Sequence, residues 1–222
     1  MSGMSDGAVV ALLVPLAYLL GTFPSAEIVA RRRGVDVTAA GSGNPGASNT
    51  FRLLGWRAGA VVFGLDAAKG AVAALAGLLI DDERGALVLG IAAIVGHMLP
   101  VTRRFKGGRG VATASGVLLV LYPLILLGAA VVWLVVVRLT RKASVASIVV
   151  VIAFPIAVAF TDASWWEVTV LAVVAVLVVV RHGSNLRRLV RGEELGIDPR
   201  ATRPPPPDST GGAGSADDPE SA

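Results

Sequence analysis

Long apolar stretches alternate with short polar segments along most of this chain. A helix that crosses a membrane needs about 20 mostly apolar residues, and six stretches approach or exceed that length. We therefore expect an all-α membrane protein in which these stretches form the helices. The stretches are Gly7–Ala30, Ala58–Ile80, Ala86–Val101, Val111–Val137, Val145–Phe160 and Trp165–Val180.

The stretch Val111–Val137 is too long for a single crossing. Its 27 residues would form a helix of about 40 Å at 1.5 Å per residue, whereas the apolar core of a bilayer is about 30 Å thick. Pro123 lies near its middle, and a proline there removes a hydrogen bond and clashes with the preceding turn. We predict two short helices with Pro123 at the turn between them.

The basic residues predict the orientation, because Lys and Arg favour the cytoplasmic side of a membrane. Of the 20 Lys and Arg residues, 18 fall in four segments. These segments can share one side only if Val111–Val137 crosses the membrane an even number of times. The pattern thus predicts about seven transmembrane helices, with the N-terminus outside and the C-terminus cytoplasmic. The basic segments are Arg31–Arg33 with Arg52 and Arg57, Arg103–Arg109, Arg138–Lys142, and Arg181–Arg203.

Composition supports a membrane domain followed by a different tail. Apolar residues make up 54% of the 222 residues and charged residues 16%, against about 25% charged in typical soluble domains. The mean hydropathy is +0.71. Residues 1–195 should form one polytopic membrane domain, whereas residues 196–222 are rich in Pro, Gly, Ser and Asp and predict a disordered tail. The absence of cysteine excludes disulfides, thiolate metal sites and a cysteine nucleophile.

Two glycine-rich loops fall on the predicted cytoplasmic side. Gly41–Asn49 holds three glycines, two asparagines and two serines. Small residues let backbone N–H groups surround an anion, and Ser48 or Asn49 could cap a helix that begins at Thr50 or Phe51. The alternative is an ordinary flexible loop. In the second loop, Phe105–Thr113, two basic residues flank two glycines without forming a Walker sequence. Together the loops favour an anion site.

Other polar residues leave two interpretations open. His182 and Asn185 would share a helix face if the helix continues past Arg181, and His182, like His97, could be catalytic or simply hydrogen-bonded. Asp66 and Lys69 lie three residues apart inside a predicted span, where ionisable groups are costly. We prefer a structural ion pair for these two. Two further residues lie near basic segments: Ser144, which could bind an anion or cap a helix, and Glu193, for which a structural salt bridge is expected.

Four sequence segments resemble one known family. GSGNPGASNTFR, GHMLPVTRRFKGGRGVAT, KASVAS and RHGSNLRRLVRGEE occur in that order between about Gly21 and Glu194. They are similar to the bacterial acyl-phosphate-dependent glycerol-3-phosphate acyltransferases of the inner (plasma) membrane. The resemblance implies transfer of a fatty acyl group from acyl phosphate to the 1-hydroxyl of glycerol 3-phosphate. The products would be 1-acylglycerol 3-phosphate (lysophosphatidic acid) and phosphate, in the first acylation of phospholipid synthesis.

The resemblance also implies partners, location and residue roles. Partners would be glycerol 3-phosphate, acyl phosphate, membrane lipid and the soluble or peripheral enzyme that makes acyl phosphate, with no nucleic acid, cofactor or metal. The active site would face the cytoplasm. The family usually has Lys where Arg109 stands and Thr where Ser48 stands, and either Lys106 or Arg109 could be the key cation. Implied catalytic residues are Ser42, Arg52, His182 and Asn185, with Glu193 structural. Implied substrate- and phosphate-binding residues are Gly43, Asn44, Gly46, Asn49, Lys106, Gly107, Gly108, Arg109, Gly110 and Ser144.

The chemistry of an acyl phosphate agrees with these residues. It is a mixed anhydride with a good leaving group and needs no covalent acyl-enzyme. Two anionic substrates repel by about 4 kcal/mol per charge pair at 4 Å and an effective dielectric of 20, which clustered basic residues offset. Either His182 or a substrate phosphate oxygen could accept the hydroxyl proton, and the second is favoured because no carboxylate obviously orients His182. A His-x4-Asp mechanism is excluded because Thr102 and Arg187 stand five residues after the two histidines. The alternative function is a membrane carrier for an organic phosphate.

Overall fold

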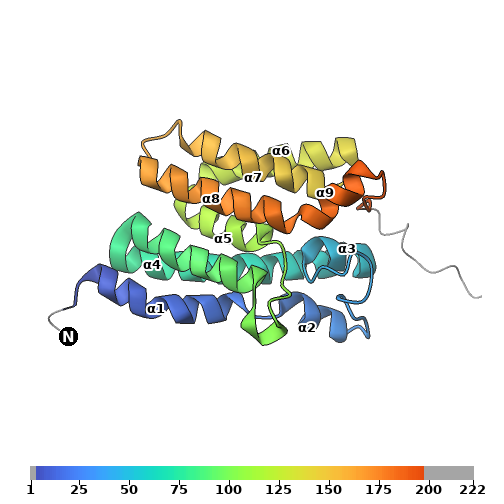
Figure 1. The fold of residues 1–222 in the computed structure, drawn as a ribbon, viewed down its shortest axis with the longest axis horizontal. Helices are drawn as coiled ribbons and strands as arrows, with labels where there is room; N and C mark the ends of the chain where they lie inside the picture. The colour runs from blue at the N-terminus through green and yellow to red at the C-terminus, as the bar shows by residue number, and fades with distance from the viewer. Residues whose placement is uncertain (1–3, 198–222) are drawn as a thin grey trace, which may run out of the picture.

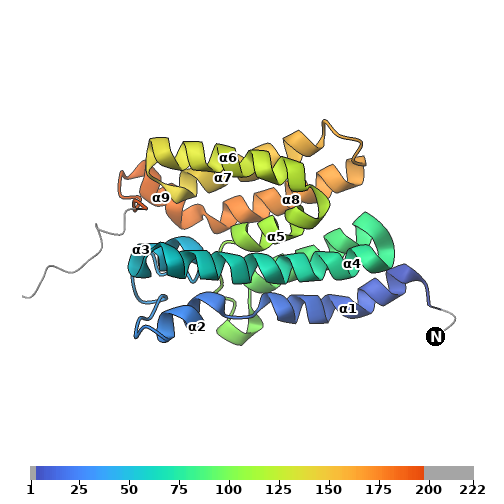
Figure 2. The ribbon, with the colours of Figure 1, turned by 180° about the vertical axis from the view of Figure 1, so that it is seen from behind.

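The apolar stretches form the helices of the bundle. The computed structural model describes residues 4–197, and within that range it contains nine α-helices, one short 3-10 helix and no strand. Figures 1 and 2 show the long helices side by side. The helices are α1 Asp6–Gly21, α2 Ser25–Arg31, α3 Ala47–Leu54, α4 Trp56–Met98, η1 Val101–Arg103, α5 Val111–Leu121, α6 Pro123–Thr140, α7 Ala143–Val158, α8 Trp165–Arg181 and α9 Gly183–Val190.

The first apolar stretch breaks into two helices. Gly7–Ala30 was expected to form one continuous helix, but α1 ends at Gly21 and α2 begins at Ser25. Pro24 explains the break, because its ring disfavours helical geometry in the residue before it. The Thr22 hydroxyl also donates to the Leu19 carbonyl oxygen at 2.7 Å, within the last turn of α1.

Helix α4 is a hairpin of two helices. Asp81 and Asp82 have non-helical backbone angles, and Asp82 has a φ of 47°. The chain then folds back so closely that a Cβ atom on Gly77 or Gly85 would overlap the backbone of the other glycine. The prediction of two helices over Ala58–Ile80 and Ala86–Val101 is therefore confirmed.

The stretch Val111–Val137 is interrupted where the sequence predicted. Helix α5 ends at Leu121, Tyr122 has non-helical angles, and Pro123 is the first residue of α6. By contrast, α8 does not continue straight past Arg181, because α9 is bent from it by 55°. His182 lies at this bend and is buried, as is Asn185 one turn further on.

Three helical segments of the described residues are long and apolar enough to cross a membrane. They are the α1–α2 unit, the α4 hairpin and α6, with the bent pair α8–α9 as a fourth candidate. The shorter apolar helices are α5 and α7. In α6, Leu124 and Leu127 are 82% and 64% exposed, as expected for a lipid-facing surface. The total of seven spans and the orientation of the termini remain predictions.

The two ends of the bundle differ. In Figures 1 and 2, α2, α3 and α9 lie at one end, and the N-terminus and the α4 turn lie at the other. At the first end, the Ile197 N–H donates to the Arg141 carbonyl oxygen at 2.9 Å. Gly196 and Ile197 therefore belong to the bundle rather than to the predicted tail. The rest of that tail lies outside the described residues.

Candidate active site

A basic cleft of about 1290 Å³ opens where the two glycine-rich loops meet the α1–α2 and α8–α9 junctions. Its lining includes six basic residues and two carboxylates, so its field favours an anionic ligand. The lining also includes apolar side chains, among them Leu19, Phe23 and Val180. The charged lining residues are Arg31, Arg103, Lys106, Arg109, Arg181, Arg187, Glu27 and Asp36.

Asn49 shapes the first glycine-rich loop. Its Nδ2 donates to the carbonyl oxygens of Val37 at 2.9 Å and Ala40 at 3.0 Å, and its Oδ1 accepts from the Ser42 N–H at 2.9 Å. The Asn49 side chain is completely buried. It therefore holds the loop from behind and does not line the cleft, and its role as a phosphate ligand stays a prediction.

The start of α3 differs from the prediction. The helix begins at Ala47, and its N-cap is Gly46, which has no capping side chain. Neither Ser48 nor Asn49 is the cap, because both lie inside the first turn. Gly46 does not line the cleft, whereas Ser42, Gly43 and Asn44 do. The loop thus presents its Ser-Gly-Asn segment to the cleft.

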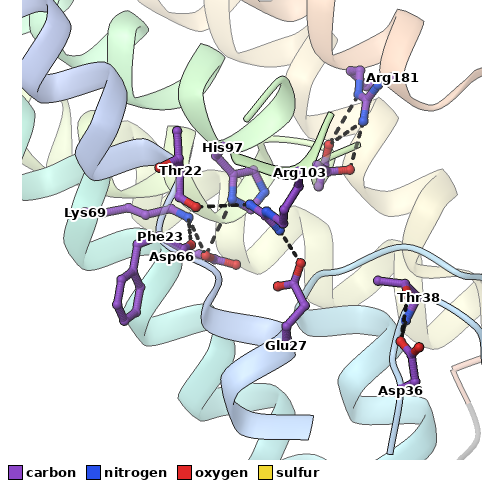
Figure 3. Close-up of polar contacts among 12 residues, drawn as sticks. Thr22, Phe23, Glu27, Asp36, Thr38, Asp66, Lys69, His97, Arg103 and Arg181 are labelled. Atoms are coloured by element: carbon purple, nitrogen blue, oxygen red, sulfur yellow. Dashed lines mark hydrogen bonds and ion pairs between the residues drawn. The ribbon is translucent and has the colours of Figure 1, made fainter. Parts of the chain in front are cut away.

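The second glycine-rich loop is held by Arg181. The Arg181 Nη2 donates to the carbonyl oxygens of Gly107 at 2.8 Å and Gly108 at 3.2 Å, and its Nε donates to Gly108 at 3.3 Å. Figure 3 shows these contacts. Lys106, Gly107 and Arg109 line the cleft, whereas Gly108 and Gly110 do not. The sequence did not identify Arg181 as a site residue, because a basic residue at the end of a membrane helix is already explained by the preference of Lys and Arg for the cytoplasmic side.

Glu194 joins two predicted site segments. The Ser144 hydroxyl and Asn185 Nδ2 each donate to its Oε1 at 2.6 Å, and Arg188 Nε donates to its Oε2 at 2.9 Å. Glu193, the predicted structural carboxylate, is exposed instead. Burial raises the pKa of Glu194, but these hydrogen bonds and the Arg188 charge outweigh burial and lower it below its ordinary value. Glu194 therefore fills the role predicted for Glu193.

His182 is buried beside these groups as a neutral ring. It is 2% exposed, and its Nδ1 lies 2.8 Å from the Val178 carbonyl oxygen. Only a protonated Nδ1 can donate to that carbonyl, so Nε2 is the basic nitrogen of the neutral ring. Burial, reinforced by the charges of Arg109 and Arg181, lowers the pKa of His182 to about 4 despite the Val178 hydrogen bond.

Arg52 and Arg109 join the two glycine-rich loops to the C-terminal segment around Glu194. Arg52 Nε donates to the Gly196 carbonyl oxygen at 2.9 Å, and its Nη1 donates to Asn49 Oδ1 at 3.3 Å. It therefore ties the first loop to the C-terminal segment. Arg109 lines the cleft and also interacts with the Glu194 charge. Burial lowers the pKa of Arg109 to about 10, so it still carries its charge at neutral pH.

The predicted ion pair between Asp66 and Lys69 is confirmed. Lys69 Nζ lies 2.8 Å from Asp66 Oδ1. His97 joins the pair, with its Nδ1 3.5 Å from the same oxygen. Figure 3 shows this group beside a second ion pair at the cleft, between Arg103 and Glu27. The Arg103–Glu27 pair and the contact of His97 with Asp66 each join segments far apart in the sequence, and they help to fix the helices that surround the cleft.

Comparison with known proteins gives a consistent result. The family model described as glycerol-3-phosphate acyltransferase matches residues 11–192. A glycerol-3-phosphate acyltransferase of Desulforudis audaxviator is 40% identical over 192 residues, covering 86% of this chain and 96% of the relative. That of Bacillus subtilis is 36% identical over 186 residues, covering 83% and 96%.

Two solved structures share the fold. They are crystal structures of PlsY, an integral membrane glycerol 3-phosphate acyltransferase, in its glycerol 3-phosphate and lysophosphatidic acid forms. Their TM-scores are 0.81 and 0.79. Each is 36% identical to this chain, and each match covers 85% of this chain and 95% of PlsY.

Proposed function

This chain belongs to the glycerol-3-phosphate acyltransferase family, and from that premise we propose that its acyl donor is acyl phosphate. The hydroxyl oxygen at position 1 of glycerol 3-phosphate attacks the acyl carbonyl carbon. The bond from that carbon to the phosphate oxygen then breaks. The products are 1-acylglycerol 3-phosphate and inorganic phosphate.

The basic cleft lined by both glycine-rich loops is the observation that carries this proposal. Each substrate brings a phosphate group, and two phosphates near each other need several cations. Lys106, Arg109 and Arg181 are supplied from two segments that meet at the second loop. We assign the acyl chain to the apolar part of the cleft lining, which includes Leu19, Phe23 and Val180. Such fixed positive charge stabilises the negative charge that develops in the transition state.

We assign the roles of the cleft residues from their positions. Ser42 and the backbone of Gly43 and Asn44 face the phosphate of acyl phosphate from the first loop, and Lys106, Gly107 and Arg109 face the phosphate of glycerol 3-phosphate. His182, Asn185 and Ser144 lie in the adjacent buried cluster. Arg52 keeps the first loop and the C-terminal segment together.

A phosphate oxygen of a bound substrate is the better proton acceptor. A phosphate monoester has a second pKa of about 6, whereas the pKa of His182 is lowered to about 4. The stronger base takes the proton more readily. No carboxylate orients the His182 ring, since its Nδ1 contacts the Val178 carbonyl oxygen. His182 Nε2 would therefore bind and orient a substrate group.

The same reasoning assigns the protein to the bacterial plasma membrane, with the cleft on the cytoplasmic side. Basic residues at α2, α9 and the second loop favour that side. Glycerol 3-phosphate would reach the cleft from the cytoplasm. Acyl phosphate would come from a soluble or peripheral enzyme that makes it.

An assay with three donors tests the proposal. The purified protein in detergent is supplied with glycerol 3-phosphate and either palmitoyl phosphate, palmitoyl-CoA or palmitoyl-acyl carrier protein. We expect lysophosphatidic acid and inorganic phosphate in equal amounts from palmitoyl phosphate alone. Turnover with a thioester donor and none with palmitoyl phosphate would contradict the proposal.

A further inference from the structure

A charged group lies inside the bundle and has no part in the steps above. Asp66, Lys69 and His97 are only 2%, 4% and 5% exposed. Asp66 binds both of the others, and Lys69 Nζ also donates to the Phe23 carbonyl oxygen at 3.2 Å. Burying charges costs several kcal/mol per ion, and apolar replacements of buried ion pairs are often as stable. Stability alone therefore does not explain this group.

His97 is the member of the group that touches the second glycine-rich loop. The Gly108 N–H donates to the His97 carbonyl oxygen at 3.1 Å. A Cβ atom at Gly108 would overlap the His97 ring at Nε2, and a Cβ atom at Gly107 would overlap the His97 carbonyl oxygen. The loop thus lies directly against His97, and both glycines are needed for this close approach.

Arg181 holds the loop from a different element. Its guanidinium donates to the carbonyl oxygens of Gly107 and Gly108, while the backbone carbonyl oxygen of His97 accepts from the Gly108 N–H. Figure 3 shows the His97 ring directed toward Asp66 and Lys69, and Arg181 reaching the loop from the other helix. The loop is thereby fixed at both glycines, and the flanking Lys106 and Arg109 line the cleft.

We propose that His97, oriented by Asp66 and Lys69, is a positioning residue that fixes the Gly107–Gly108 loop for the phosphate of glycerol 3-phosphate. This inference rests on the proposed function, in which that loop binds this substrate. Lys69 extends the same group to Phe23, which lines the cleft at the α1–α2 junction. The Asp66 carboxylate therefore connects the second glycine-rich loop, through His97, with the α1–α2 junction, through Lys69.

A double-mutant cycle between His97 and Gly108 tests the proposal. His97→Ala should raise the KM for glycerol 3-phosphate about 10- to 100-fold, the scale of a displacement of about 1 Å in a binding group. The KM for palmitoyl phosphate should change less than threefold. Gly108→Ala should raise the same KM through its overlap with the ring, but should add little once the ring is absent.

The cycle has outcomes that overturn the proposal. An unchanged KM for glycerol 3-phosphate in His97→Ala would overturn it. Additive effects of His97→Ala and Gly108→Ala on that KM would also overturn it. If His97→Ala does not fold, the cycle uses His97→Asn, which keeps a donor for Asp66 and removes the ring edge that meets Gly108. Additivity in that cycle would overturn the proposal as well.

Tyr122→Phe is a matched control. It removes a hydrogen bond from the Tyr122 hydroxyl to Glu167 Oε2 at 2.9 Å, which joins α8 to the residue between α5 and α6. It should lower the melting temperature and leave the KM for glycerol 3-phosphate unchanged. An equal KM rise in this variant would show that KM follows general destabilisation, which would contradict a positioning role. Failure of the wild-type protein to use palmitoyl phosphate would instead count against the proposed function.

Discussion

Replacing Glu194 should destabilise the protein strongly, whereas replacing its neighbour Glu193 should not. Glu194→Ala leaves the Ser144 hydroxyl, Asn185 Nδ2 and Arg188 Nε without their shared acceptor. Breaking a buried ion pair costs about 3–5 kcal/mol. The Arg188 side chain is 25% exposed and regains some solvation, so we expect about 3 kcal/mol. Glu193 is exposed, and its replacement should stay within about 0.5 kcal/mol.

Unfolding in detergent measures both effects. Glu194→Gln is an informative intermediate, because an amide oxygen can still accept from Ser144 and Asn185 but the charge opposite Arg188 is lost. We expect it to lose about half as much stability as Glu194→Ala. Equal losses in the Glu193 and Glu194 variants, or no loss in either, would refute the assignment of Glu194 as the buried acceptor.

The lowered pKa of Glu194 adds a pH dependence with a definite sign. Its stabilising contribution should be complete above the ordinary pKa of a glutamate and should be lost as the pH falls through the lower folded value. The Glu194→Gln protein should lack this part of the acid dependence. An unchanged acid dependence in that variant would contradict the proposed ionised state.

Three further predictions concern the cleft and the topology. Arg181→Ala should raise the KM for glycerol 3-phosphate about tenfold or more, because two carbonyl groups of the second loop lose their hydrogen bonds. Arg181→Lys should recover only part of the substrate affinity, since Lys lacks the planar fork of Arg. A wild-type KM in Arg181→Ala would refute the role of Arg181 in holding the loop. His182→Asn should keep measurable activity, since an amide can still bind phosphate. A folded but inactive His182→Asn protein with normal substrate affinity would show that His182 is the base. Because the pKa of His182 is lowered to about 4, the wild-type protein should also lose stability as the pH falls from about 6.5 to 4, and His182→Asn should lose less stability over this range. Single cysteines introduced at exposed positions test the orientation with membrane-impermeant thiol reagents. Cysteines in place of Arg33, Arg141 and Arg191 should be labelled from the cytoplasm, and those in place of Asp82 and Asp162 from outside. Labelling of any position from the opposite side would refute the orientation.

The sequence predicted the helices well where apolar length and proline decided them. The break at Pro123 followed from the length of its stretch, and the α4 turn followed from a short acidic segment. The break at Pro24 was missed, although the residue was visible, because the whole stretch was long enough to be one span. Apolar length alone cannot distinguish a single helix from two helices with a bend.

The candidate site was predicted by segment but not by contact. Both glycine-rich loops do meet at one cleft. The sequence could not tell which of two adjacent carboxylates turns inward, since that depends on the backbone after Gly192, whose φ is 74°. Nor could it show that Asn49 uses its amide on the loop backbone. Such assignments depend on the direction of a side chain, which residue type does not determine.

The α4 hairpin has a consequence for how the chain enters the membrane. Its two halves touch through Gly77 and Gly85, and small residues of this kind allow helices to pack where lipid gives no hydrophobic driving force. Asp66 and Lys69 would each cost about 2.5–3.5 kcal/mol to insert alone, but they pair within one helix and meet His97 on the other half. The hairpin should therefore insert as one unit with its charges already paired. Gly77→Val should uncouple the two halves in a translocon insertion assay, and unchanged insertion would contradict this order of events.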